Sequence, residues 1–379
     1  MKTSYLVFTI VLVFTIGKIS GQEIEDITIG KKITIYSDVL NQDREIYIHL
    51  PDGYNDCVSS YPVIYVLDAE QNFHPMSGLI KLMSWQKLIP KMIVVGIPNI
   101  NRIKDFMPAI DTIPTSGGAD KFVSFFSAEL FPHIQKNYRT ESFKILYGYS
   151  YSGMFAVHCF KKYPEIFNAY IAGSPSLKWN IDYLCSDKTP SKKLDRNSFL
   201  HISIGELENT NSIDKINRFT SYLETQDAEK LIWKSDLVNN ANHDINAAFS
   251  LSYGLNFIFS DWKKIKQVIY QGMTSVENHY SKLSDKYNYT VKVPEDIYQK
   301  GGIYYLQNGN VDKSIEIFMK YIQSYKSSYT AYNYLGKALI LKKDIKKAEE
   351  NFQKALELKP DYKDAIDNLE TIYQERNKN

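Results

Sequence analysis

The chain has 379 residues, of which 44% are hydrophobic, and a formal net charge of +2. This length favours two domains over one, and the hydrophobic content is sufficient for a sizeable core. Lys2 and Lys18 lie in an N-terminal segment that we expect to be removed, so the remaining chain is close to neutral. A chain without strong net charge argues against nucleic acid or another polyanion as a partner.

Residues 1–21 have the three parts of a secretory signal peptide. A lysine near the start precedes an apolar run from Tyr5 to Ile16, and the small residues Ser20 and Gly21 precede an acidic stretch. An apolar run of about a dozen residues is too short to span a bilayer, which needs ~20. No cysteine follows the expected cleavage point, which argues against a lipid anchor. We therefore expect a secreted or periplasmic protein with no membrane span after cleavage.

From Ile27 to Trp262, strand patterns alternate with helical patterns. The first two strands read as an antiparallel pair, and the later ones are nearly continuous apolar runs separated by helices, which is typical of a parallel sheet covered on both faces. The predicted strands are Ile27–Tyr36, Arg44–Leu50, Pro62–Leu67, Met92–Ile97, Phe143–Tyr147, Ala169–Ala172, Phe199–Ile204 and Leu231–Leu237. The pattern predicts an α/β domain over residues 22–275 with a mostly parallel eight-stranded sheet.

The segment Lys144–Gly153 has the layout of a nucleophile elbow. An apolar strand ends at Gly148, Ser150 follows two residues later, and a helix pattern begins at once. Such a turn holds the serine in a strained conformation at a helix N-terminus, with Oγ exposed. Close backbone packing there requires small residues at Gly148, Ser152 and Gly153, although Ser152 stands where the motif usually has glycine.

A nucleophilic serine needs a base within hydrogen-bond reach and an acid that orients the base. Of the seven histidines, His243 lies in the polar loop after the last strand, whereas His279 lies in the expected connector. The acid is expected after the seventh strand, where a glycine followed three residues later by an acid selects Glu208, with Glu206 as the competitor. A solvent-exposed charge is the alternative role of either glutamate.

Backbone N–H groups next to the serine are expected to stabilise the oxyanion of a tetrahedral intermediate. The N–H of Tyr151 is one candidate, and the second is the N–H of Glu70 or Ala69, in the turn after the third strand. Three side chains near the serine are candidates for substrate binding: Tyr149, Arg102 and Trp179. A surface ion pair is the alternative role of Arg102.

The three cysteines are widely spaced and odd in number. Cys159 falls in the helix after Ser150, where we expect a small buried hydrophobic residue. A disulfide between Cys57 and Cys185 after export is left open. No pair of Cys or His has metal-ligand spacing, so no metal is expected. No cofactor is expected either.

From Glu295 onward the chain is rich in helix formers and tyrosines, with a 34-residue period. Residues 329–362 fit the tetratricopeptide pattern: Gly336 and Ala348 allow two helices to approach closely, and Phe352 fills the gap between them. Residues 295–328 fit it less tightly, and one later helix would cap the stack. We therefore predict a connector over 276–294 and an all-α repeat domain over 295–379, able to bind a protein partner or a second copy of the chain.

The hydrolase portion resembles the "Putative esterase" family, which includes esterase D and feruloyl, acetylxylan and siderophore esterases. The segments that carry the resemblance are Tyr61–Asp68, Val94–Asn99, Gly117–Phe122, Tyr163–Pro164 and Ser174–Ser176, followed by Trp179. The resemblance implies an α/β-hydrolase fold with Ser150 as nucleophile, Glu208 as acid and His243 as base. The chain departs from the family pattern at Ser152 and Ala69, where glycine is usual.

These observations favour a hydrolase of small carboxylic esters that forms an acyl-enzyme on Ser150. An acyltransferase or a thioesterase would use the same residues. The alternative from a different functional class is a scaffold protein whose hydrolase domain is inactive and whose repeats bind partners.

Overall fold

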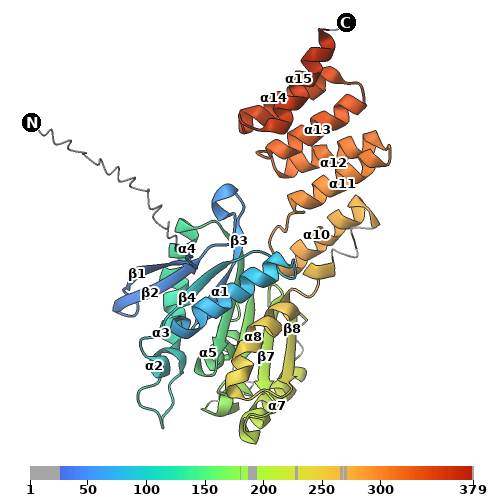
Figure 1. Ribbon diagram of the computed structural model, residues 1–379. Helices are drawn as coiled ribbons and strands as arrows, with labels where there is room; N and C mark the ends of the chain where they lie inside the picture. The colour runs from blue at the N-terminus through green and yellow to red at the C-terminus, as the bar shows by residue number, and fades with distance from the viewer. Residues whose placement is uncertain are drawn as a thin grey trace, which may run out of the picture.

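The computed structural model describes residues 26–179, 181–186, 194–226, 229–264, 268 and 271–377. An eight-stranded sheet in the order β1-β2-β4-β3-β5-β6-β7-β8 forms the centre of its N-terminal part (Figure 1). β1 pairs with β2, and β2 with β4, in antiparallel orientation, while the other neighbours pair in parallel. The predicted signal peptide, residues 1–21, lies outside the described residues.

All eight predicted strands form, which confirms the α/β fold with a mostly parallel sheet. Their bounds are β1 Lys31–Ser37, β2 Gln42–His49, β3 Tyr61–Leu67, β4 Ile93–Ile97, β5 Thr140–Tyr149, β6 Ala169–Gly173, β7 Ser198–Gly205 and β8 Leu231–Val238. The first strand begins at Lys31 rather than at Ile27, because its partner β2 ends at His49 and Lys31 already pairs with Ile48.

Helices cover both faces of the sheet. In the N-terminal part they are α1 Ala69–Trp85, α2 Arg102–Phe106, α3 Ala119–Phe125, α4 Phe131–Asn137, α5 Tyr151–Lys162, α6 Ile181–Leu184, α7 Thr210–Glu224 and α8 His243–Ile258. α1 and α8 lie on one face, where Phe73 and Leu251 pack with Ile145 of β5. On the other face Phe155 of α5 packs in the cluster that contains Leu146. Successive residues of β5 thus point into opposite cores, as strand geometry requires.

The cysteines do not crosslink the chain. Cys159 is fully buried, as predicted, while Cys57 and Cys185 are both free, so the disulfide left open by the sequence is not formed. Among the described residues, no helix combines the length and the apolar character that crossing a membrane requires.

The segment predicted as the connector contains most of α10 (Met273–Tyr287), which packs against the sheet domain. The ring of Tyr287 lies 5.4 Å from that of Phe143, 5.9 Å from Phe199 and 5.2 Å from Phe259 between centroids. Phe143 and Phe199 lie near the starts of β5 and β7. α10 therefore attaches at the amino ends of these strands, the edge of the sheet opposite to Ser150.

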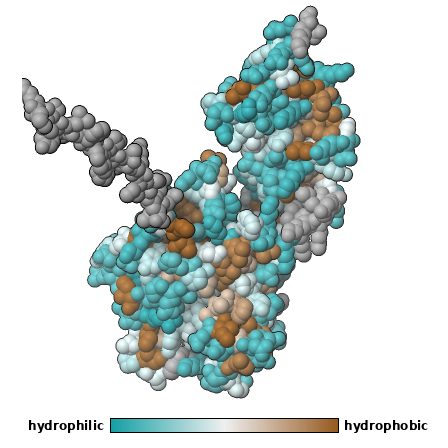
Figure 2. All heavy atoms as spheres, viewed as in Figure 1, coloured by the Kyte–Doolittle hydropathy of each residue, from teal (hydrophilic) through white to brown (hydrophobic). Residues whose placement is uncertain are grey.

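Five further helices follow α10 and stack away from the sheet (Figure 1). They are α11 Glu295–Gln307, α12 Val311–Ser324, α13 Tyr329–Leu341, α14 Ile345–Leu358 and α15 Lys363–Arg376. Their apolar contacts continue the core that α1 and α8 share with the sheet. The visible face of both parts is mostly hydrophilic, with apolar residues in separate patches (Figure 2).

The close helix contact predicted in the repeat is present in both helix pairs. A Cβ atom added at Gly336 would lie 2.6 Å from the ring of Phe352, and one at Gly302 would lie 2.2 Å from the ring of Phe318. Both phenylalanines are fully buried. The glycine and the phenylalanine therefore fix how closely the two helices of each pair approach.

We predict that Gly336→Ala destabilises the repeats by about 1–3 kcal/mol, because the added methyl group overpacks the contact with Phe352. Gly78→Ala in α1 is the matched control: nothing lies within 4 Å of the added atom, so it is expected to be neutral or to stabilise by up to about 1 kcal/mol. Urea unfolding followed by circular dichroism measures both changes. A Gly336→Ala protein at least as stable as the wild type would contradict the packing described.

Candidate active site

Ser150 occupies a sharp turn between β5 and α5. Its backbone has φ 60° and ψ −112°, a conformation that L-residues rarely adopt. Neighbouring segments hold it there: the Ser150 N–H donates to the Gly173 carbonyl at 2.9 Å, and the Ser150 carbonyl accepts from the Ser176 N–H at 3.1 Å. A Cβ at Gly148 would lie 2.1 Å from the Ser152 carbonyl oxygen, so the turn requires glycine there. The elbow geometry expected from the sequence is present.

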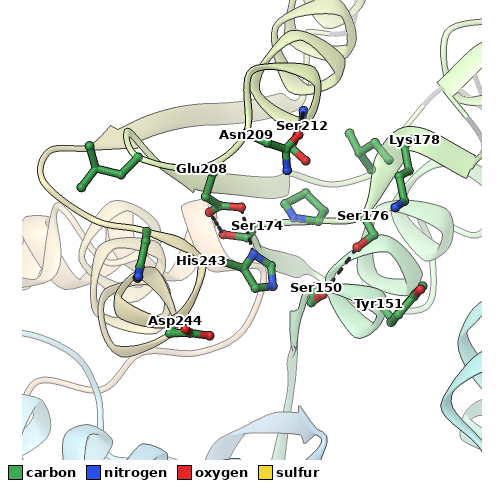
Figure 3. Close-up of a pocket in the computed structure, with 14 residues that line it drawn as sticks. Ser150, Tyr151, Ser174, Ser176, Lys178, Glu208, Asn209, Ser212, His243 and Asp244 are labelled. Carbon is green, nitrogen blue, oxygen red and sulfur yellow. Dashed lines mark hydrogen bonds and ion pairs between the residues drawn. The ribbon is translucent and has the colours of Figure 1, made fainter.

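His243 and Glu208 come together beside this turn (Figure 3). Glu208 follows the end of β7, and His243 is the first residue of α8. His243 Nδ1 lies 2.9 Å from Glu208 Oε2. The competitor Glu206 is exposed, and its carboxylate accepts the Asn240 N–H at 2.9 Å. The geometry therefore pairs His243 with Glu208 and not with Glu206.

The surroundings of Glu208 favour its ionised form. Its side chain is 5% exposed, against 47% for His243, so the carboxylate is buried behind the imidazole. Burial raises the pKa of Glu208, but hydrogen bonds from His243, Ser174 and the Gly205 N–H outweigh burial and lower it. The hydrogen bond to Glu208 in turn raises the pKa of His243, against the effect of its partial burial, and the nearby Asp244 charge adds to the rise.

The imidazole of His243 lies between Glu208 and Ser150 in the close-up (Figure 3). Ser150 Oγ is 3.4 Å from Ser176 Oγ, and within the described part of the chain it makes no hydrogen bond to His243. Such bonds are often long in free enzymes and tighten when substrate binds. Because Nδ1 faces the carboxylate, Nε2 is the nitrogen available to Ser150.

Three polar residues, Ser174, Asn246 and Tyr149, lie behind the His243 imidazole. Of these, only Tyr149 is a site candidate from the sequence. Ser174 Oγ donates to Glu208 Oε1 at 2.5 Å and accepts from Asn246 Nδ2 at 2.7 Å. The Tyr149 hydroxyl lies 2.9 Å from Ser174 Oγ and also contacts the His243 carbonyl, while its ring lies 5.1 Å from the imidazole. Burial raises the pKa of Tyr149, so the phenol stays a donor at neutral pH. Tyr149 therefore packs against His243 and is not among the residues that line the cavity described below, so its expected role in substrate binding stays a prediction.

Sequence reasoning missed the roles of Ser174 and Asn246. Ser174 was noted only as part of a family-like segment, and Asn246 sits one helical turn after His243. The spacing of Asn246 from His243 was the one signal that could have found it, because residues three apart on a helix share a face.

Arg102 is held by Asp68, the residue before α1. Its Nε and Nη2 atoms lie 2.8 and 2.9 Å from the two carboxylate oxygens. The guanidinium remains partly exposed, at 40% for the side chain, so substrate binding by Arg102 stays a prediction alongside this ion pair. Trp179 ends the short helical turn Leu177–Trp179, and its side chain lies outside what the structure describes.

The expected oxyanion donors lie at the starts of two helices. Tyr151 is the first residue of α5, and Ala69 and Glu70 are the first two of α1. N–H groups in a first helical turn have no acceptor within the helix. The Glu70 carboxylate accepts from the Asn99 N–H at 3.1 Å and from its side-chain amide at 3.0 Å, so it is engaged elsewhere and the backbone N–H remains the group of interest.

A cavity of about 440 Å³ opens beside Ser150 and His243. Hydroxyl, amide and charged groups make up most of its wall, and among the described residues Tyr151 and His243 supply its only aromatic rings. The lining residues are Ser150, Tyr151, Ser174, Pro175, Ser176, Leu177, Lys178, Leu207, Glu208, Asn209, Ser212, Asn242, His243 and Asp244. The site is therefore suited to a substrate with polar groups near the reacting bond.

Known proteins with similar sequences or structures include siderophore esterases. The chain is 30% identical over 177 residues to the ferri-bacillibactin esterase BesA of Bacillus subtilis, covering 40% of this chain and 61% of that protein. It is 28% identical over 136 residues to the siderophore triacetylfusarinine C esterase of Aspergillus fumigatus, covering 31% of this chain and 45% of the relative. The chain thus spans less than two thirds of either relative's length.

A solved structure of an IroE-like serine hydrolase from Shewanella oneidensis superposes with a TM-score of 0.67 at 25% identity, over 76% of this chain and 97% of the other. A tetratricopeptide-repeat model matches residues 329–362, the segment in which the sequence predicts the clearer repeat. The "Putative esterase" family model matches residues 37–248, which include Ser150, Glu208 and His243. The chain belongs to the "Putative esterase" family.

Proposed function

We propose that the protein is a serine carboxylic-ester hydrolase in which Ser150, His243 and Glu208 act together. The observation that carries the proposal is the position of His243, hydrogen-bonded to Glu208 at 2.9 Å and facing the strained turn of Ser150. A buried carboxylate, an imidazole and an exposed hydroxyl in this order are the elements of an activated serine nucleophile.

In the proposed reaction, Ser150 Oγ attacks the ester carbonyl carbon while His243 Nε2 takes the hydroxyl proton. The carbonyl π electrons move to oxygen, and the N–H groups of Tyr151 and of Ala69 or Glu70 stabilise this oxyanion. When the intermediate collapses, the C–O bond breaks and His243 protonates the departing alcohol. His243 then removes a proton from water, which attacks the acyl carbon. The bond from this carbon to Ser150 Oγ breaks, His243 returns the proton to Oγ, and the acid is released. Glu208 holds the imidazole in the correct tautomer throughout.

For the substrate we propose a small ester that carries polar groups. The hydroxyl and amide groups that line the cavity support this class. The two relatives named as siderophore esterases make siderophore esters the first substrates to assay.

The division of the chain also remains a proposal: a signal peptide over 1–21, the hydrolase over 22–275, a connector over 276–294 and repeats over 295–379. On this division the protein is exported. A protein partner on the repeats would lie away from the cavity, since α10 packs at the opposite edge of the sheet.

Ser150→Ala is expected to lower turnover of 4-nitrophenyl acetate at least about 10³-fold, because it removes the hydroxyl proposed to accept the acyl group. Ser124→Ala, an exposed serine of α3, is the control and should keep wild-type turnover. Initial rates measured on folded proteins decide the matter. Equal rates for Ser150→Ala and the wild type would contradict the assignment of Ser150 as the nucleophile.

Glu208→Gln is expected to lower kcat about 10³- to 10⁴-fold, because the amide favours the wrong tautomer of His243 and does not stabilise the imidazolium. Glu206→Gln is the matched control, two residues away and exposed, and should change kcat by less than about twofold. If the large loss followed Glu206→Gln instead, the acid would have to be reassigned.

The pH profile should show a raised pKa for the base. His243 must be neutral to accept a proton, so kcat/KM is expected to fall as the pH drops through a midpoint above the ordinary value of about 6.5. Asp244→Asn removes a nearby negative charge that stabilises the imidazolium, so it should move this midpoint to lower pH. A midpoint that stays in place or moves upward in Asp244→Asn would contradict this electrostatic account.

A further inference from the structure

The hydroxyl of Ser152 joins the two turns that carry the expected oxyanion donors. Ser152 is fully buried in the first turn of α5. Its Oγ accepts the Tyr149 N–H at 2.8 Å and lies 2.6 Å from Asp68 Oδ2. A hydroxyl has one proton to donate, and the ionised carboxylate is a closer and stronger acceptor than the Tyr149 carbonyl at 2.9 Å. Ser152 therefore accepts from the end of β5 and donates to Asp68.

Asp68 in turn fixes the start of α1. It has a left-handed backbone with φ 53° and ψ 44°, and its carbonyl accepts the N–H groups of Gln71 at 3.1 Å and Asn72 at 3.0 Å. Its buried carboxylate is held by Arg102, by Ser152 and by the Asn99 side-chain amide. The first turn of α1 therefore cannot shift without disturbing these bonds.

We propose that Ser152 is a positioning residue that fixes the position of the second oxyanion donor, the N–H of Ala69 or Glu70, relative to Ser150. This inference rests on the proposed function. The Tyr151 N–H and Ser150 belong to one turn, so their geometry is fixed locally. The Ala69 and Glu70 N–H groups belong to another helix, and the bond between Ser152 and Asp68 ties that helix to the elbow.

A residue without a hydroxyl at position 152 would remove the hydrogen bond that links the elbow to Asp68. The buried carboxylate of Asp68 would lose one donor and the Tyr149 N–H would lose its acceptor, which loosens both turns. Complete loss of one oxyanion donor costs about 10² to 10³ in kcat. A donor that is displaced and not removed should cost less, about tenfold.

The test compares Ser152→Ala with the wild type in the full chain. Turnover of 4-nitrophenyl acetate gives kcat and KM, and inhibition by phenylboronic acid, which forms a tetrahedral adduct with an active serine, reports on the oxyanion site. We expect kcat to fall about tenfold with KM within about twofold, and the boronate Ki to rise by a similar factor.

Ser77→Ala is the matched control, because Ser77 is also fully buried, lies on α1, and has a hydroxyl with no partner among the described residues. It should leave kcat, KM and the boronate Ki unchanged. If Ser152→Ala does not fold, Ser152→Cys keeps the size with a much weaker donor and should show the same pattern.

The inference is overturned if a folded variant at position 152 keeps kcat and the boronate Ki within about twofold of the wild type, even if its melting temperature falls. That result, together with turnover that still depends on Ser150, would leave the proposed function intact. Wild-type turnover that persists in Ser150→Ala would overturn the proposed function itself.

Discussion

The hydrogen bond between His243 and Glu208 depends on the topology of the whole sheet. β7 and β8 are parallel neighbours, so the loops after them emerge at the same edge, and residues far apart in the chain meet at 2.9 Å. β5 ends at this edge too, with β6 between it and β7, and delivers Ser150. The fold thus places an imidazole, a carboxylate and a strained serine together without any of them being neighbours in sequence.

Two buried polar networks flank Ser150. On the histidine side, Ser174 links Glu208 with Tyr149 and Asn246. On the opposite side, Asp68 links Arg102 with Ser152 and the start of α1. A buried polar group that loses its partner is costly, so the hydrogen bonds of these networks disfavour alternative arrangements. The loops that carry Ser174 and Glu208 are consequently held in place by hydrogen bonds.

The sequence alone was sufficient to predict features whose pattern lies within a short stretch of the chain. Apolar runs predicted the strands, the strand–turn–helix pattern predicted the elbow at Ser150, and the repeat period predicted the contact of Gly336 with Phe352. It was insufficient where contacts join several elements. The choice between Glu208 and Glu206 depends on the direction of a turning backbone, and the part played by Ser174 needs three segments in space. Ser152 looked like a tolerated small residue, because its partner Asp68 is far away in the chain.

The central claim is that Ser150 carries the acyl group during turnover. Intact-mass spectrometry of the protein, quenched in acid during hydrolysis of a slow ester, tests it directly. The account predicts a mass increase equal to one acyl group, located after digestion on the peptide that contains Ser150. An adduct on another residue, or active turnover of the ester in which no adduct can be trapped at any time or pH, would contradict it.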